Sequence, residues 1–200
     1  RFVGNLQDRS VPLPSRLGVM TTTTVTPYRA ALTPLSDIVA TVTDWAAPSP
    51  CEGWSALDVL DHILTTQRAL LTERGLTLPP PADLAADPVA AWAAHAATVA
   101  GLLDDPAIAG IAYDGHFGPT TLGETVERFY VFDMLVHRWD LARAAGSDTS
   151  FTDAELDRID ESAQSFGPVL YMEGICRPAV PAASDADRQT RVLATLGRRA

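Results

Sequence analysis

The residues best placed to do chemistry lie in the stretch 122–145, which reads as one long amphipathic helix. Projected at about 100° per residue, its apolar positions form a single arc. Asp133 falls in the middle of that arc, and His137 and Asp140 fall beside it. The arc consists of Leu122, Val126, Phe129, Tyr130, Val136, Leu141 and Ala144. Burying a carboxylate without a partner is costly, so a second side chain, ordered water or a cation must compensate.

The spacing of Asp133 and His137 is compatible with a shared metal ion. Side chains four residues apart on a helix point the same way, one turn from each other. A carboxylate and an imidazole so placed can reach one ion, and helical bundles build metal sites from such inward pairs on facing helices. The alternative is a buried Asp133–His137 pair without a metal, and the spacing alone leaves both interpretations open.

A third ligand has to come from another helix, and periodicity does not select it. His62 lies in the predicted helix 55–74, at the edge of an apolar arc centred near Leu60, Ile63 and Leu64. That position is typical of a boundary histidine that packs on a neighbour. His95, in an alanine-rich helix, and His116, in a glycine-rich loop, are rivals. We predict both of them to be surface or boundary residues.

Helical periodicity and capping signals predict an almost entirely helical protein. The predicted helices cover residues 27–45, 55–74, 88–103, 122–145, 152–167 and 185–196. Pro34 is expected to kink the first of them. Residues 105–120 are irregular and allow only a short strand pair. Four long helices with connectors, one of them long, favour an all-α four-helix bundle with short extra helices.

The first residues differ from the rest of the chain. Residues 1–19 are polar, contain prolines and show no periodicity, whereas Met20 followed by four threonines reads like a start. We therefore predict a leader over residues 1–19 that does not belong to the fold, and one helical domain over residues 20–200.

Composition excludes several classes of partner. The chain has 200 residues and a net charge of −10, which disfavours nucleic acid and anionic membranes. The sequence lacks an 18-residue apolar run and a signal-peptide pattern, so we expect a cytoplasmic protein. All 15 basic residues are arginine, which excludes Schiff-base chemistry on lysine. Cys51 and Cys176 form no CxxC pair and are expected to be reduced thiols. A homodimer is compatible with these features.

Three stretches of the sequence resemble one known family. They are Cys51-Glu52-Gly53-Trp54, Asp58-Val59-Leu60-Asp61-His62 and Val136-His137-Arg138-Trp139-Asp140-Leu141-Ala142-Arg143-Ala144. They resemble the actinobacterial DinB-like group, which includes the N-terminal domain of mycothiol-dependent maleylpyruvate isomerase. The similarity covers residues 27–198, and the tail 178–198 is similar to an uncharacterised subgroup. The resemblance implies a DinB-like four-helix bundle with a metal near one end.

The family's metal ligands carry over onto His62, Asp133 and His137. This resemblance, and not the periodicity, selects His62 over His95. The chain departs from the isomerase pattern at Asp133, where a glutamate is expected. It also shows no counterpart of the isomerase's additional C-terminal domain, so maleylpyruvate is not the expected substrate.

The implied ligand set predicts an open metal site. Two histidines and one carboxylate suit zinc first, and nickel or ferrous iron next. Three protein ligands leave a position open, and a thiolate can fill it. The resemblance thus implies a metal-dependent transferase or isomerase that uses mycothiol on a small electrophile. Arg138 and Arg143 are candidates for contacts with mycothiol. Asp140 is expected either to orient a bound ligand or to pair with a backbone amide or an arginine.

Two other functions stay open on the sequence. In a metal-dependent hydrolase the ion activates water, and Asp140, Glu124 and Asp58 are the candidate general bases. A metal- or ligand-binding module without catalysis is the other alternative. Cys51 has no triad context that marks a nucleophile. Trp54 and Trp139 are expected to pack in the core, with an aromatic wall beside the metal as the second interpretation.

Overall fold

The computed structural model describes residues 26–172 and 174–200, so the predicted leader 1–19 lies outside the described residues. Within them the chain is mostly helical, and its one sheet is the antiparallel hairpin of β1 and β2. The elements in chain order are α1 Pro27–Val39, α2 Ala56–Glu73, α3 Pro88–Leu103, α4 Pro106–Ala109, β1 Ala112–Gly115, β2 Gly118–Thr121, α5 Leu122–Thr125, η1 Val126–Tyr130, α6 Val131–Ala145, α7 Asp153–Phe166, η2 Gly167–Tyr171 and α8 Arg188–Thr195.

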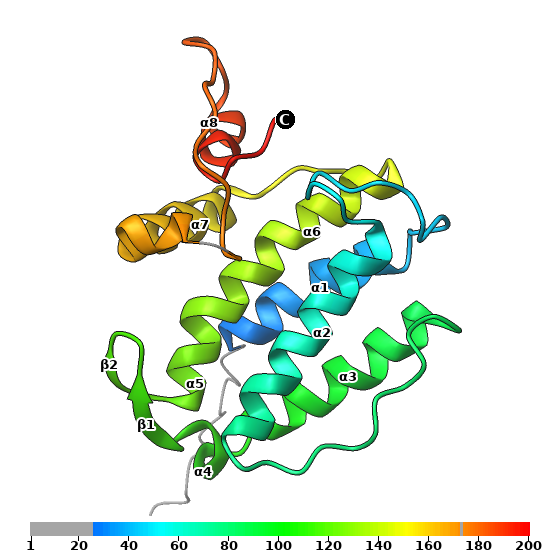
Figure 1. The fold of residues 1–200 in the computed structure, drawn as a ribbon, viewed down its shortest axis with the longest axis vertical. Helices are drawn as coiled ribbons and strands as arrows, with labels where there is room; N and C mark the ends of the chain where they lie inside the picture. The colour runs from blue at the N-terminus through cyan, green and yellow to red at the C-terminus, as the bar shows by residue number, and fades with distance from the viewer. Residues whose placement is uncertain (1–25, 173) are drawn as a thin grey trace, which may run out of the picture.

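The bundle consists of helices α1, α2, α3 and α6, which pack against one another. Helix α6 packs against α1 and α2, and both of these pack against α3 (Figure 1). The long connection is the segment 74–87, between α2 and α3. Helix α7 covers a further side of α6, and α8 packs on α7. This is the predicted all-α bundle with short extra helices. No helix of the described residues is long and apolar enough to cross a membrane.

The helix starts follow the predicted capping signals. Ser55, Thr121 and Thr152 each accept a hydrogen bond from the amide three residues on. In each case the acidic side chain at that third position reaches back to the cap, which completes a capping box. These local bonds satisfy amides that have no partner within the helix, so they fix where α2, α5 and α7 begin.

Helix α1 is shorter than predicted. It passes through Pro34 without a break but ends at Val39, not near residue 45. The following segment pairs with the start of α2 instead, because the amides of Ala56 and Leu57 donate to the carbonyls of Ala47 and Trp45. A tertiary backbone pairing therefore replaces the last helical turns.

The predicted helix 122–145 is one helical run with a π-helical segment, η1, one turn after its start. The wider π turn shifts the residues before it relative to those after it, so one helical wheel cannot describe the whole run. Phe129 and Tyr130 are half-buried as a result. The Asp133 side chain is 27% exposed, so the prediction that it lies in the middle of a buried arc is wrong.

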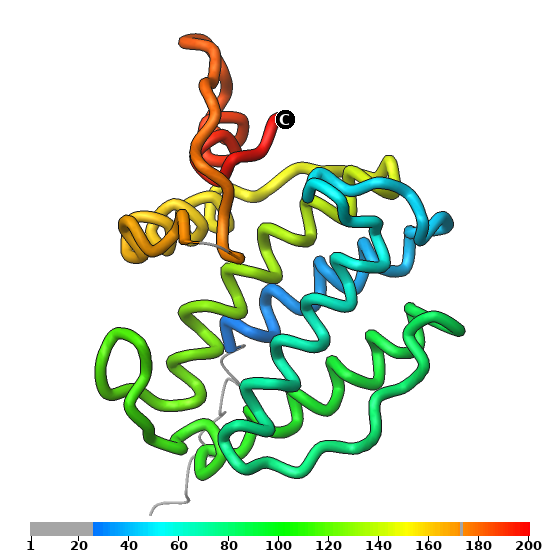
Figure 2. Tube along the Cα trace, in the orientation of Figure 1, coloured from blue at the N-terminus to red at the C-terminus, as the bar shows by residue number. Residues whose placement is uncertain are grey.

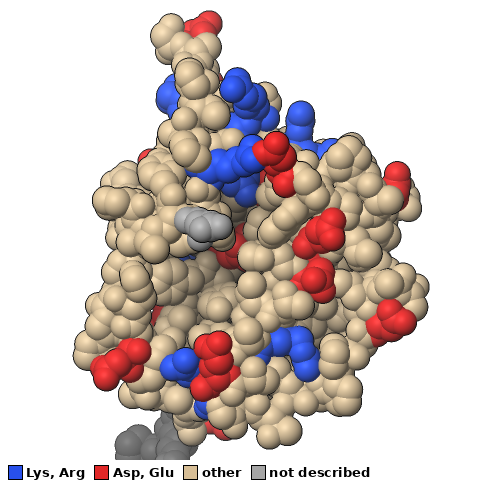
Figure 3. Space-filling view, viewed as in Figure 1, with Lys and Arg blue, Asp and Glu red and all other residues tan. Residues whose placement is uncertain are grey.

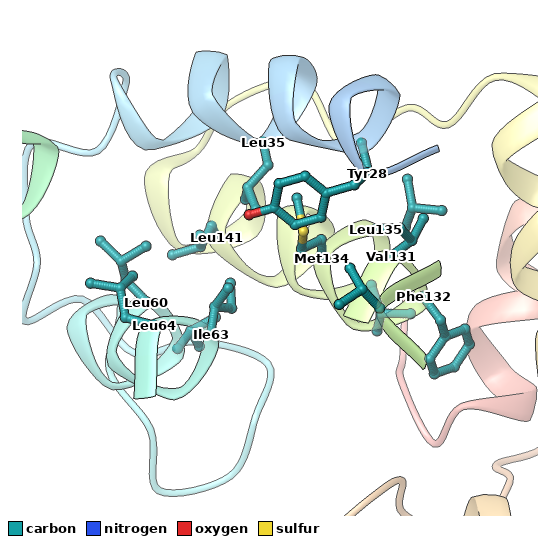
Figure 4. Close-up of a cluster of buried hydrophobic side chains, with 14 of the residues drawn as sticks. Tyr28, Leu35, Leu60, Ile63, Leu64, Val131, Phe132, Met134, Leu135 and Leu141 are labelled. Carbon is teal, nitrogen blue, oxygen red and sulfur yellow. The ribbon is translucent and has the colours of Figure 1, made fainter. Parts of the chain in front are cut away.

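The core lies between α1, α2 and α6. Figure 4 shows apolar side chains from these three helices pointing toward one another, with Phe132 directed away from them. The buried contributors drawn there include Tyr28, Leu35, Leu60, Ile63, Leu64, Val131, Met134, Leu135 and Leu141. This packing holds α2 and α6 side by side, and these two helices carry the candidate ligands.

His95 is buried, contrary to the surface or boundary position that we predicted. Its ring Nε2 lies 3.0 Å from the side-chain oxygen of Gln67, which also accepts a hydrogen bond from the Tyr28 hydroxyl at 3.0 Å. The alanine-rich α3 has no clear polar side, so periodicity could not reveal which face packs inward. His116 is exposed, as predicted.

We expect His95 to make the protein less stable in mild acid. Burial, together with the charge of Arg68, lowers the pKa of His95 to about 4, so the unfolded chain takes up this proton first as pH falls. The contribution of neutral His95 to the free energy of unfolding is therefore fully present above about pH 6.5 and is lost as the pH falls toward 4. At pH 5 the loss is about 2 kcal/mol. Urea unfolding at pH 7 and pH 5 should show this loss in the wild type and a smaller one in His95→Gln. Equal losses in both proteins would contradict a neutral buried His95.

Candidate metal centre

His62, Asp133 and His137 converge on one point between α2 and α6. The distance from Asp133 Oδ1 is 3.5 Å to His62 Nε2 and 3.3 Å to His137 Nε2. One potential ligand atom from each residue lies within 4.8 Å of the other two. The α6 residues are one turn apart, and His62 faces them from α2. The bundle thus brings together the three side chains that the resemblance singled out.

The three side chains face a pocket of about 590 Å³. Its walls come from α2, the connector 50–54, the η1–α6 run, the end of α7, and the C-terminal stretches 171–172, 174–178 and 196–198. Figure 3 shows a hollow in the face turned to the viewer, with acidic atoms inside it and basic side chains grouped above it. Since the side chains of His62 and Asp133 are about one quarter exposed, a small molecule in the pocket can reach them.

Asp133 carries a buried carboxylate oxygen beside the two histidines. Its Oδ2 is buried and has no hydrogen-bond partner among the described residues. Burial raises the pKa of Asp133, but His137 and His62 outweigh burial and hold the pKa below its usual range. The group is therefore a carboxylate with one unsatisfied oxygen, beside two imidazole nitrogens. These donors fit a divalent metal ion of the zinc type.

The Nδ1 atom of His137, on the side of the ring away from Asp133, contacts a buried carboxylate. His137 Nδ1 lies 2.9 Å from Asp140 Oδ2, and Asp140 is fully buried. Arg198 donates to both oxygens of Asp140, through Nε at 2.9 Å and Nη2 at 2.7 Å. Burial raises the pKa of Asp140, but these hydrogen bonds outweigh burial and lower it to about 2. Asp140 thus pairs with an arginine, which is one of the two roles predicted for it, and the role of orienting a bound ligand stays a prediction.

This arrangement fixes the direction of the His137 ring. When the Nδ1 hydrogen is donated to Asp140, the lone pair of Nε2 points toward Asp133 and His62. In the protein without metal, burial lowers the pKa of His137, but Asp133 and Asp140 outweigh burial and raise it well above its usual value.

Cys51 belongs to the same corner of the pocket. Its Sγ lies 3.3 Å from Asp140 Oδ2 and 3.7 Å from Arg198 Nη2. Cys51, His137 and Asp140 form a second group with metal-ligand spacing. That group is less suited to a cation, since Asp140 already binds Arg198 and His137 Nδ1. Cys51 and Cys176 are both free thiols that line the pocket, and burial raises the pKa of Cys176.

The family profile of the mycothiol maleylpyruvate isomerase N-terminal domain matches residues 28–142. The chain belongs to this family. The matched range includes the three candidate ligands and Asp140, and it ends before Cys176 and Arg198. In this member of the isomerase N-terminal domain family, the C-terminal wall of the pocket therefore comes from outside the matched region. Comparisons with curated proteins and with solved structures give no match.

The family's Cys-Glu-Gly-Trp stretch forms an aromatic wall. The ring of Trp54 lies 5.1 Å from that of His62 and 6.2 Å from that of His137, centre to centre. Trp54 is half-buried, packs against the core cluster and lines the pocket, so it combines the two positions expected for it. Trp139 is buried, as predicted.

The two arginines proposed for mycothiol do not line the pocket. Arg138 pairs with Glu155 at 2.9 Å, and the Arg143 guanidinium lies 5.6 Å from the centre of the Trp139 ring. The pocket's arginines are Arg177 and Arg198, both from the C-terminal segment. Arg198 could not be identified from the sequence, because 58 residues separate it from Asp140.

The three candidate general bases are all engaged in other bonds. Asp58 and Glu124 complete the capping boxes of α2 and α5. Asp140 binds Arg198 and His137. None of these carboxylates is therefore placed to take a proton from water at the candidate metal centre.

Proposed function

We propose that His62, Asp133 and His137 bind one divalent ion, zinc in the first instance, and that the protein uses this ion to activate a small thiol. Membership in the isomerase N-terminal domain family supports mycothiol as that thiol. The proposal rests above all on Asp133, whose Oδ2 is buried with no hydrogen-bond partner among the residues that the structure describes, while Oδ1 faces two imidazoles. The reaction is a thiol transfer, or an isomerisation that depends on the thiol.

A bound zinc ion lowers the pKa of a thiol and favours its thiolate form. The protein's own groups prepare the site for this. Asp140 and Arg198 fix the tautomer and the direction of His137, and Trp54 packs against the ring of His62. The half-buried aromatic walls limit the access of water, which strengthens electrostatic interactions inside the pocket.

The engagement of Asp58, Glu124 and Asp140 favours thiol chemistry over hydrolysis. A hydrolase needs a base that removes a proton from the attacking water. A thiol depends less on a general base, because it is more acidic than water and more nucleophilic once it is ionised.

We expect the zinc-loaded protein to bind mycothiol more tightly than S-methyl mycothiol, by about tenfold or more, because methylation removes the thiolate. Calorimetry with both compounds measures this ratio, and Asp133→Ala serves as the control that should lose the preference. Equal binding of both compounds, or of neither, would remove the thiol from the mechanism. Zinc binding without thiol binding would then favour a hydrolase or a binding module.

A further inference from the structure

Three phenylalanines form a cluster beside the candidate metal ligands. Phe129 stacks on Phe166 with ring centres 5.3 Å apart, and Phe132 meets Phe166 edge-on at 5.2 Å. All three line the pocket. Phe129 lies in η1, four residues before Asp133 on the same helical run. This phenylalanine cluster therefore forms an apolar wall next to the metal ligands.

Exposed apolar side chains are concentrated at the same pocket. In the part of the chain that the structure describes, five large hydrophobic residues are exposed, and three of them line the pocket. These three are Tyr171, Met172 and Ile175, from the segment after α7. Figure 2 shows that the chain runs from this segment alongside α8, reverses its direction and then forms α8. Apolar surface gathered around a concave site is typical of ligand binding.

The arginines that line the pocket are paired with acidic side chains, and Arg128, which does not line it, lies 5.4 Å from the centre of the Phe129 ring. Arg198 is paired with Asp140, and Arg177 with Glu52. His137 lies between two carboxylates, those of Asp133 and Asp140. Among the described residues, the pocket thus has no cationic side chain without an acidic partner. An anionic ligand gains little here, whereas an uncharged aromatic group gains stacking and apolar burial.

We propose that the pocket takes an uncharged electrophile with an aromatic group, which packs on Phe129 and Phe166. This inference rests on the proposed function, which places the thiol on the metal ion beside this cluster. In the reaction, the thiolate sulfur forms a bond to the electrophilic carbon, and the leaving group departs with its electron pair. The phenylalanine cluster selects the aromatic electrophile, and the metal ion held by His62, Asp133 and His137 binds the thiol.

Binding of two inert compounds to the metal-free protein tests the substrate class without the thiol chemistry. The pair is 1,3-dinitrobenzene, which is uncharged, and 3,5-dinitrobenzoate, which adds one carboxylate to the same ring. We expect dinitrobenzene to bind at least about tenfold more tightly, measured by quenching of tryptophan fluorescence and by calorimetry. Equal or tighter binding of the benzoate, or no binding of dinitrobenzene, would overturn the proposal.

A matched pair of variants locates the binding site. Phe129→Ala should weaken dinitrobenzene binding about tenfold, whereas Phe151→Ala should leave it unchanged. Phe129 and Phe151 are both half-buried, but only Phe129 lines the pocket. Equal effects of the two changes would show that the compound binds elsewhere.

Turnover separates this proposal from the proposed function. The zinc-loaded protein with mycothiol should convert 1-chloro-2,4-dinitrobenzene, with release of chloride, faster than 4-chloro-3,5-dinitrobenzoate. Selective binding of dinitrobenzene without any thiol-dependent turnover would support the aromatic site and overturn the thiol chemistry. Turnover that prefers the benzoate would support the thiol chemistry and overturn the aromatic site.

Discussion

Replacing His137 with alanine should remove nearly all bound zinc. The change deletes the most deeply buried of the three candidate ligands and leaves His62 and Asp133 with an incomplete set. Mutation of groups that only support a ligand typically lowers metal affinity 10–100-fold, so we expect a loss of more than about 100-fold here. Elemental analysis of untagged protein after dialysis measures the zinc content.

The matched control is His116→Ala, which removes an exposed histidine away from the pocket. It should keep full zinc content. His62→Ala and Asp133→Ala should behave like His137→Ala, because all three side chains face the same point. Full zinc occupancy in His137→Ala, with circular dichroism showing a folded protein, would disprove the site.

Replacing Asp140 with alanine should destabilise the protein by about 3–5 kcal/mol, since it leaves the Arg198 cation buried without its partner. The side chains of Asp140 and Arg198 are 0% and 10% exposed, so solvent screens this pair little. Urea unfolding of the metal-free protein measures the change. The double variant Asp140→Ala with Arg198→Ala should lose less stability than the sum of the two single changes.

An exposed ion pair provides the comparison. Arg29 and Asp104 form a salt bridge with side chains that are 42% and 51% exposed. Asp104→Ala should therefore lower the free energy of unfolding far less than Asp140→Ala does, because solvent screens the exposed pair. If Asp140→Ala were as mild as Asp104→Ala, Asp140 would not hold Arg198 and His137 in the way described.

The helices could be predicted where the determining interactions are local. The capping boxes at Ser55, Thr121 and Thr152 involve residues only three positions apart, and the predicted starts agree with the structure. The end of α1 could not be predicted in this way. It depends on backbone pairing between residues 45–47 and the start of α2, which involves residues about ten positions away.

The candidate site was predictable only in part. Spacing pointed to Asp133 and His137, but the π segment η1 made the helical wheel unreliable for their burial. His62 required the family resemblance, because its position at the edge of an apolar arc is ambiguous. In the structure that edge of α2 borders the pocket. The helical wheel separates buried from exposed positions, so it could not identify His62 as a ligand.

The side chains that contact Asp140 behind His137 could not be predicted from the sequence. Cys51 and Arg198 reach Asp140 across 89 and 58 residues, respectively. The Arg198 contact arises because the C-terminal segment folds back on the bundle, and the Cys51 contact arises because the connector before α2 lies beside α6. His95 was misjudged for a related reason, since its partners Gln67 and Tyr28 lie on other helices.

X-ray absorption at the zinc edge tests the central claim most directly. For the zinc-loaded protein without thiol, the account predicts only nitrogen and oxygen ligands, at about 2.0–2.2 Å, with two imidazoles among them. After mycothiol is added, one sulfur ligand should appear at about 2.3 Å. A sulfur ligand before the thiol is added would place the ion at Cys51 or Cys176 and contradict the assignment to His62, Asp133 and His137.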